Sequence, residues 1–556
     1  MTKHHKSKEN KIGKLIHVTN KSKLTPDLNC LRYATPVEQI NRTWFRNTED
    51  ECWIAINPTN PKNMIIVTHQ DRFVNFIADI ILYTVDGGET WNESNITLSR
   101  CQWATLPYAL DDYESASDPN VYFDNKGNAY VTSVSFNTKQ NFDEAIVLIK
   151  STDGGRSWTH PIEVTRDDGS SHIQDRQTGN ADPFIPDTSY IVWTDFQANI
   201  DPINFGNNVV FQKSIDGGSS WSDPKVIDSY FSSDGILNPW SNIVEVLNDK
   251  HHTIAVFSRV TSDVVGENKD FIIVNRSENG GNTFTNFSNH SLITYQIVVD
   301  PDTEIVVQAV AEDIDVALNN CRNKIYLVTL DPRFNSTGGA GVTIIMSNDG
   351  GKTWSDPVPV NPNTLDVQTF LPSVAVLEDG TVGVMFYDFR FFKSGDISLK
   401  TDVWLALFDE NLTHWLGEIR LTDESFDSRQ FLRRVAPGSI YDNALFIGDY
   451  VKMIAYKNTF LSSFCISNPP YGVGPAPPAN KEFRLDERAG VIFPNRQDVV
   501  FRKVKINNHC CDKNLNIKSI KPSNINNNIN IKNNKQQLIN TGRNERINAI
   551  IQQKKN

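Results

Sequence analysis

A short phrase repeats along this chain at a nearly constant interval. Its full form, Ser/Thr-x-Asp-Gly-Gly-x-Ser/Thr-Trp, begins at Thr84, Ser151, Ser214 and Ser347, and a variant with Asn and Phe begins at Ser277. Each copy follows an apolar run that is typical of a β-strand, and its paired glycines supply the positive φ angles of a tight turn. Because the copies recur about every 60 to 70 residues, we expect an architecture of repeated β-units.

The second repeat shows the unit most clearly. Strands are predicted at 120–124, 129–136, 145–150 and 158–164, which makes a four-stranded antiparallel meander, the blade of a β-propeller. Asp118-Pro119 opens this repeat, and Asp182-Pro183 is expected to open the third in the same way. Seven inner strand pairs can be counted. We therefore predict an all-β propeller of seven blades, with six blades and a capping segment as the alternative.

The two ends of the chain differ in composition from its middle. Residues 1–40 are polar and lysine-rich and are predicted to form a flexible arm, whereas residues 41–505 form the propeller. Residues 506–556 are rich in Asn, Lys and Ile and are predicted to be a disordered tail. The role of that tail is left open.

Charge and composition exclude several classes of function. The formal net charge of −12 argues against nucleic-acid binding, and no apolar run approaches the ~18 residues of a membrane span. No signal peptide is visible, so we expect a protein that is cytoplasmic or packaged in a particle. The seven cysteines are scattered without the spacing of a zinc site, so no metal and no cofactor are expected. The chain is expected to be a monomer.

Strand direction separates the repeated turns from a set of charged residues. Successive strands of a blade run antiparallel, so the turns after third strands lie on one face, and second strands end on the opposite face. That opposite face collects acids and arginines at Asp71, Arg72, Asp118, Arg259, Arg333, Asp388, Arg390 and Asp449, with Tyr450 beside the last of them, and a loop before the third repeat adds Asp175 and Arg176. These residues could line a polar pocket with carboxylates for proton transfer and arginines for an anion, or they could be pairs that brace neighbouring blades.

The repeated phrase resembles the Asp-box, or BNR repeat, of the sialidase superfamily. Further stretches resemble bacterial exo-α-sialidase-like proteins across roughly residues 50 to 465, among them Gln70-Asp71-Arg72, Ser117-Asp118-Pro119, Tyr387-Asp388-Phe389-Arg390 and Gly448-Asp449-Tyr450. The resemblance implies a sialidase-like propeller that acts on a glycan or glycoconjugate. It also implies a glycoside hydrolase that removes a terminal, acidic sugar.

The resemblance also assigns roles to individual residues. It implies Asp118 or Asp71 as the acid/base and Tyr450 or Tyr387 as the nucleophile. The implied substrate-binding residues are Arg72, Arg333 and Arg390, with Arg259 as an alternate clamp, and Asp388 and Asp449 beside them.

One motif of the family is missing from this chain. The Phe/Tyr-Arg-Ile-Pro motif does not occur, and Phe184-Ile185-Pro186 lacks its arginine. A second hypothesis therefore stands beside the hydrolase: a non-catalytic propeller that binds a glycan or a protein. Enzymatic activity is favoured but left open.

Overall fold

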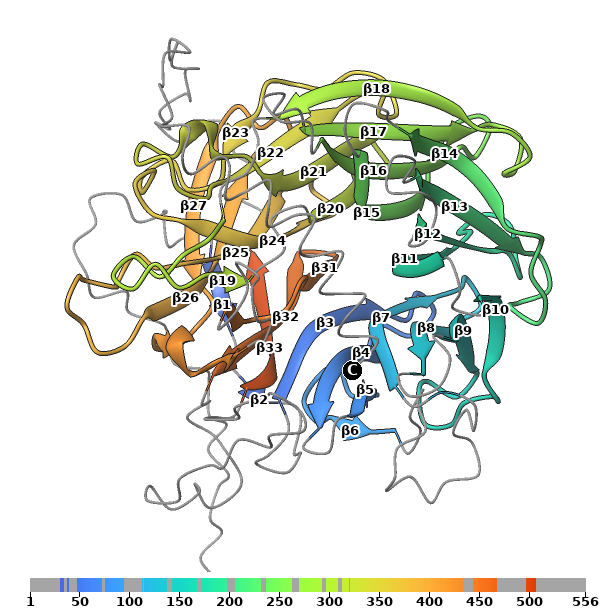
Figure 1. Ribbon diagram of the computed structural model, residues 1–556, viewed down its shortest axis with the longest axis horizontal. Helices are drawn as coiled ribbons and strands as arrows, with labels where there is room; N and C mark the ends of the chain where they lie inside the picture. Colours follow the sequence, from blue (N-terminus) through green and yellow to red (C-terminus); the bar gives the residue numbers. More distant parts are fainter. Residues whose placement is uncertain are drawn as a thin grey trace, which may run out of the picture.

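The computed structural model forms a ring of β-sheets around a central axis (Figure 1). It describes residues 31–34, 38–39, 48–72, 76–94, 113, 115–137, 143–167, 172–197, 206–231, 237–262, 270–292, 297–308, 313–319, 321–433, 444–467 and 497–506. Helix in these ranges is limited to two 3₁₀ turns, η1 (Pro332–Phe334) and η2 (Ser428–Gln430). None of the described helices is long and apolar enough to cross a membrane.

Seven sheets form the ring, as the seven-blade prediction requires. The first three blades, each listed from the axis outward, are β3 (Thr48–Ile56), β4 (Met64–Arg72), β5 (Phe76–Thr84) and β6 (Asn92–Glu93); β7 (Ser115–Phe123), β8 (Ala129–Phe136), β9 (Glu144–Ser151) and β10 (Ile162–Asp167); and β11 (His172–Ala181), β12 (Ser189–Gln197), β13 (Gly206–Ser214) and β14 (Lys225–Phe231). Each is an antiparallel meander.

Blades four to six repeat this order. They are β15 (Leu237–Val246), β16 (Ile254–Ser262), β17 (Asp270–Ser277) and β18 (Thr285–Leu292); β20 (Ile314–Asn319), β21 (Lys324–Leu330), β22 (Val342–Ser347) and β23 (Val358–Pro359); and β24 (Thr369–Val376), β25 (Val382–Asp388), β26 (Lys400–Phe408) and β27 (Trp415–Arg420). Short additions are β28 (Phe426–Asp427), which pairs with β26, and a small sheet of β19 (Val307–Gln308), β30 (Leu445–Phe446) and β29 (Leu432–Arg433).

The seventh blade joins the two ends of the propeller. Its inner strands are β31 (Lys452–Tyr456) and β32 (Thr459–Ser467), followed by β33 (Gln497–Ile506) and then by β1 (Leu31–Ala34). A further short strand, β2 (Glu38–Gln39), also pairs with β33. Residues 31–34 and 38–39, inside the expected flexible arm, are thus strands; the rest of residues 1–40 and everything after Ile506 lie outside the described residues.

Apolar side chains fill the spaces between neighbouring blades. Between blades one and two, for example, Ile65 and Val67 lie in one buried cluster with Val131 and Val147, and Trp158 packs against it. The inner strands β3, β7, β11, β15, β20, β24 and β31 contact one another in a closed circle (Figure 1). Each blade therefore buries apolar surface against two neighbours.

The third blade differs in one detail from the sequence-based expectation. Neither Asp-Pro pair opens its blade, because Asp118 lies inside β7 and because β11 already ends at Ala181, before Asp182. Asp182 instead lies in the turn between β11 and β12, where its carboxylate accepts hydrogen bonds from the backbone N–H of Phe184 (2.8 Å) and from the hydroxyl of Tyr190 (2.7 Å). The prediction was wrong because Asp-Pro suits a strand bulge and a turn equally well.

The repeated phrase forms the turn after the third strand, which we call the Asp turn. In the Asp153 copy, the carboxylate accepts the backbone N–H groups of Arg156 (3.0 Å) and Ser157 (2.9 Å) and the hydroxyls of Ser151 (2.8 Å) and Ser157 (2.5 Å). Gly154 and Gly155 have φ of 79° and 93°, so a side chain at either position would be strained. Burial acts to raise the pKa of Asp153, but these hydrogen bonds outweigh it and hold the pKa below its ordinary value.

Replacing the carboxylate of one Asp turn should test how much the turn contributes to stability. We expect Asp153→Ala to lower the free energy of unfolding by about 1–2 kcal/mol, as loss of a comparable capping side chain does. Asp153→Asn should cost less, because Asn279 already holds the fourth copy with its amide oxygen 2.9 Å from the Ser277 hydroxyl and 3.0 Å from the Thr283 N–H. Chemical denaturation of both variants measures the difference. Equal losses would mean that the turn depends on the negative charge.

Removing the first strand should test the closure of the ring. Deletion of residues 1–34 removes β1 and exposes the edge of β33 from Val504 to Ile506, while β2 still pairs with Val500 and Phe501. We expect the apparent melting temperature to fall by several degrees and aggregation on heating to increase. The matched control is deletion of residues 1–20, which leaves β1 intact. An unchanged melting temperature in the longer deletion would show that β32 and β33 complete the ring without β1.

Candidate functional site

Several inner strands are interrupted by a bulge near the face opposite the Asp turns. The register of β3, β7, β11 and β24 shifts at this point. One residue in each of these bulges has a positive φ, namely Glu51 (53°), Asp118 (55°), Arg176 (58°) and Leu371 (48°). A bulge redirects a side chain, and positive φ in residues other than glycine is costly, so such positions are concentrated at functional sites.

The bulged residues occupy equivalent positions in their blades. Each lies six residues before the turn that links the first and second strands, as Glu51 lies before Asn57 and Asp118 before Asp124. The same spacing in all seven blades defines a set that we call the axial ring: Glu51, Asp118, Arg176, Ser241, Asp313, Leu371 and Tyr450. Six of these seven side chains are polar. The fold therefore brings a guanidinium, a phenol, a hydroxyl and three carboxylates to one level of the axis.

Arg176 is the central cation of the axial ring. Its Nη2 donates to Oδ1 of Asp313 at 2.7 Å, and its Nη1 lies 3.8 Å from Oδ2 of Asp449. The guanidinium carbon is 5.3 Å from the centre of the Tyr450 ring. Only 6% of the Arg176 side chain is exposed, and its Nη1 is buried without a hydrogen bond in the part of the chain that the structure describes. This nitrogen remains able to donate to a bound group.

The axial ring surrounds a small cavity. A volume of about 20 Å³ is lined by Asp118, Arg176, Ser241, Asp313 and Tyr450, which is room for about one water molecule. In the wall of this cavity, the ring of Tyr450 meets the ring of Trp53 edge-on, with the two ring centroids 5.8 Å apart. A sugar could therefore bind only at the mouth of this cavity.

A larger cavity lies at the Asp-turn end of the axis, on the other side of Trp53. It has a volume of about 510 Å³, and its lining includes Tyr122, Glu245 and Lys452. Burial raises the pKa of Glu245 to about 7, against the opposing effect of Lys452. Lys452 is itself paired with Asp315. The larger cavity thus has the greater volume, whereas the axial ring carries the reactive groups. We assign the candidate site to the axial ring, because it combines several carboxylates with a cation and a phenol.

Burial changes the proton affinity of the axial ring. Burial raises the pKa of Asp313 to about 6, even though Arg176 and the Ser241 hydroxyl, which donates at 2.7 Å, favour the ionised form. Burial, and then the carboxylates of Glu51 and Asp118, raise the pKa of Tyr450 well above its usual value. The phenol therefore stays protonated, and its hydroxyl donates to the carbonyl of Pro119 at 3.3 Å.

Three of the residues expected from the sequence lie at the axis. Asp118 and Tyr450 belong to the axial ring, and Asp449 approaches Arg176. Asp71 and Arg72 end β4 on the same face as these residues, but their side chains lie outside what the structure describes.

The other expected residues lie within or between blades. Arg259 is fully buried and pairs with Asp270 at 2.9 Å while donating to the Leu330 carbonyl of the next blade at 2.8 Å. Arg333 pairs with Asp331 at 2.8 Å at the start of η1. Arg259 thus links two blades, as the alternative bracing interpretation requires, whereas Arg333 pairs with an acid two residues away in its own blade.

Blade six contains the remaining three. Arg390 is held between Asp388, at 2.5 Å, and Glu418 on the outermost strand, and it covers the Trp404 ring at 3.7 Å. The hydroxyl of Tyr387 donates to the Cys465 carbonyl at 3.0 Å inside the apolar core. The structure does not bring Tyr387, Asp388 or Arg390 to the cavity of the axial ring.

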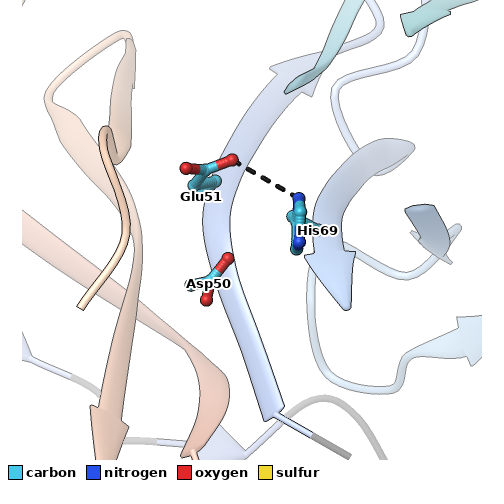
Figure 2. A group of neighbouring side chains, drawn as sticks. All are labelled: Asp50, Glu51 and His69. Atoms are coloured by element: carbon cyan, nitrogen blue, oxygen red, sulfur yellow. Dashed lines mark ion pairs between the residues drawn. The ribbon is translucent and has the colours of Figure 1, made fainter. Parts of the chain in front are cut away.

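Sequence reasoning missed Glu51, Ser241 and Asp313. The signal that could have found them is the constant six-residue spacing before the first turn of each blade. It also missed a group of metal-ligand type beside the ring, formed by Asp50, Glu51 and His69 (Figure 2).

Removing the central cation should destabilise the ring in a pH-dependent way. Arg176→Met leaves Asp313 buried without its ion-pair partner, which typically costs about 3–5 kcal/mol. The folded-state pKa of Asp313 is already raised and should rise further, so the loss should be larger at pH 8 than at pH 5, where the carboxyl group is protonated. Denaturation at both pH values measures this. Adding Asp313→Asn should restore part of the stability at pH 8; no restoration would contradict the pairing.

Comparison with known proteins yields only distant structural likenesses. No protein-family model matches the sequence, and no curated protein matches it. Among solved structures, a protein of unknown function from Dyadobacter fermentans aligns with TM-score 0.40 and 12% identity over 86% of this chain and 99% of its own. An α-L-arabinanase from Penicillium chrysogenum (0.38, 14%, 64% and 94%) and an intramolecular trans-sialidase from Ruminococcus gnavus (0.33, 12%, 76% and 90%) also align. Likenesses this weak carry no argument about activity.

Proposed function

We propose that this protein acts on a glycan and that its axial ring hydrolyses the bond to a terminal, acidic sugar, as in a sialidase-type glycoside hydrolase. One observation carries the proposal: strands from different blades bring Asp118, Arg176, Asp313 and Tyr450 to a single cavity. Glycoside hydrolysis needs a proton donor and a nucleophile or base beside the sugar. The resemblance of the Asp turns to the Asp-box of sialidases supports the same assignment.

Two residues have the chemistry for bond cleavage. Asp118 is half-buried at the cavity and is held in its conformation by the bulge of β7, so it is the candidate acid/base. Tyr450 is the candidate nucleophile. Its phenol must lose a proton as it attacks, and Glu51, whose charge raises the pKa of Tyr450, is the candidate acceptor of that proton.

Arg176 supports an acidic sugar as the substrate. Its buried Nη1 makes no hydrogen bond in the described part of the protein, and Arg176 lines the cavity, so this nitrogen could donate to a sugar carboxylate. Asp313 competes with that carboxylate for the guanidinium. Binding of an anion should therefore depend on whether Asp313 carries a charge.

Hydrolysis of fluorogenic glycosides tests the proposal directly. The panel contains an α-sialoside, a hexuronide and a neutral pentoside, assayed across roughly pH 4–8. We expect turnover of an acidic glycoside, and Asp118→Asn should lower kcat about 100- to 10,000-fold. Asp187→Asn, a partly exposed carboxylate on the Asp-turn face, is the matched control and should retain full activity. Turnover that survives Asp118→Asn would place the chemistry elsewhere.

The pH dependence of KM tests the role of Arg176. Below pH 6 Asp313 becomes protonated and no longer neutralises the guanidinium, so KM for an acidic glycoside should fall as the pH drops through about 6. Asp313→Asn should keep KM low at every pH, and KM for a neutral glycoside should not follow this curve. A KM that is independent of pH in the unmodified protein would argue against Arg176 as the anion-binding group.

A non-catalytic propeller that binds a glycan is the second candidate. It is favoured by the cavity of about 20 Å³ and by the Tyr450 hydroxyl, which is engaged with the Pro119 carbonyl. Binding to a glycan array without turnover of any glycoside would support this candidate over the hydrolase.

A further inference from the structure

Asp50, Glu51 and His69 form a compact buried group beside the axial ring. Asp50 and Glu51 lie on β3 and His69 lies on the neighbouring strand β4 (Figure 2). One ligand atom from each residue can be chosen so that all three lie within 4.8 Å of one another. The three residues are 0%, 3% and 6% exposed, respectively. The group thus combines an imidazole and two carboxylates at a separation that a single ion can bridge.

A backbone irregularity explains how two consecutive residues can join the same group. Neighbouring side chains of a regular strand point to opposite faces of the sheet. The register of β3 shifts between Asp50 and Trp53, and Glu51 has a φ of 53°. This bulge turns Glu51 out of the regular alternation, so its carboxylate reaches His69, with 3.6 Å between Glu51 Oε2 and His69 Nδ1.

Two more buried carboxylates lie beside this group. Glu49 accepts a hydrogen bond from the Gln70 amide at 2.6 Å, and Asp79 accepts one from the Ser133 hydroxyl at 2.5 Å. Both carboxylates are fully buried. A cation bound by the group would therefore lie among acidic side chains.

We propose that Asp50, Glu51 and His69 bind a divalent transition-metal ion of the Zn²⁺ or Mn²⁺ type. The donor set favours this class, because imidazole suits Zn²⁺ and related ions and carboxylates suit Mn²⁺. Mg²⁺ and Ca²⁺ prefer oxygen ligands alone and should bind much more weakly. Three protein ligands leave further coordination positions for water.

The position of the site indicates a structural role at the junction of the first and last blades. Glu51 Oε1 accepts the backbone N–H of Asp449 at 3.3 Å, and Cys52 forms a parallel bridge with Val451. A Cβ on Gly448 would lie 2.9 Å from the Glu51 nitrogen, so the two blades touch closely here. An ion held by β3 and β4 would stiffen the surface against which the seventh blade closes. The inference does not rest on the proposed function: with the ion bound, the Glu51 carboxylate is a ligand, and it could accept the Tyr450 proton only in the metal-free protein.

Calorimetric titration of the full-length, chelator-treated protein with Zn²⁺ and Mn²⁺ tests the site. We expect the ion to bind at one site and to raise the melting temperature of the protein when it is bound. His69→Gln and Asp50→Asn should each weaken binding by at least about 100-fold, since even outer partners of a metal site contribute 10- to 100-fold. The matched control is His172→Gln, which removes another histidine–carboxylate pair, with Asp195 at 2.9 Å, that has no third ligand among the residues that the structure describes. It should bind the ion as the unmodified protein does.

A measurement on the unmodified protein tests the proposal even if the variants fail to fold. Pulsed electron paramagnetic resonance of the Cu²⁺-loaded protein should detect one imidazole nitrogen at the ion. Absence of binding, absence of that nitrogen, or binding that persists in folded His69→Gln would overturn the proposal. The group would then be an imidazolium–carboxylate cluster.

Discussion

Closure of the ring is the constraint on which the rest of this structure depends. Each blade buries apolar side chains against two neighbours, so the seventh blade must meet the first before these two blades are fully covered. The protein meets this demand by pairing β33 with β32 on one side and with β1, from near the other end of the chain, on the opposite side. The axial ring exists only because of this closure, since Glu51 of the first blade and Tyr450 of the last become neighbours across the same junction.

Much of the fold could be predicted because the repeated phrase is typical of one kind of tight turn. The Asp-Gly-Gly sequence specifies a turn after the third strand, and that turn determines the relative direction of the two strands that it joins. The face that holds Asp118, Asp449 and Tyr450 followed from strand direction alone. The roles of Arg259 and Arg390 could not be predicted in this way. An acid–arginine pair at the end of a strand has the same sequence whether it binds a ligand or braces a blade, and only its burial and its partners separate the two.

The remaining site residues were hidden by the bulges of the inner strands. A bulge adds one residue and changes which side chains face the axis, so the alternating pattern on either side of it no longer matches. For this reason Arg176 reads as part of a loop in the sequence but lies inside β11 in the fold. Glu51 is hidden in the same way, because in a regular strand its side chain would point to the face opposite that of Asp50. Counting from the turn avoids this problem, since no insertion lies between the bulge and the turn.

The composition of the axial ring favours proton movement over fixed ion pairing. Three carboxylates surround one guanidinium in a space that holds about one water molecule, so not every acid can be stabilised as an anion. Burial raises the pKa of Asp313 to about 6, and the Tyr450 phenol holds its proton. Acidic groups whose pKa values are separated by their environment can exchange protons in the neutral range, which is what general acid–base chemistry requires. A set of bracing ion pairs would instead match each acid with its own base, as Arg259 and Asp270 do between β16 and β17, the middle strands of blade four.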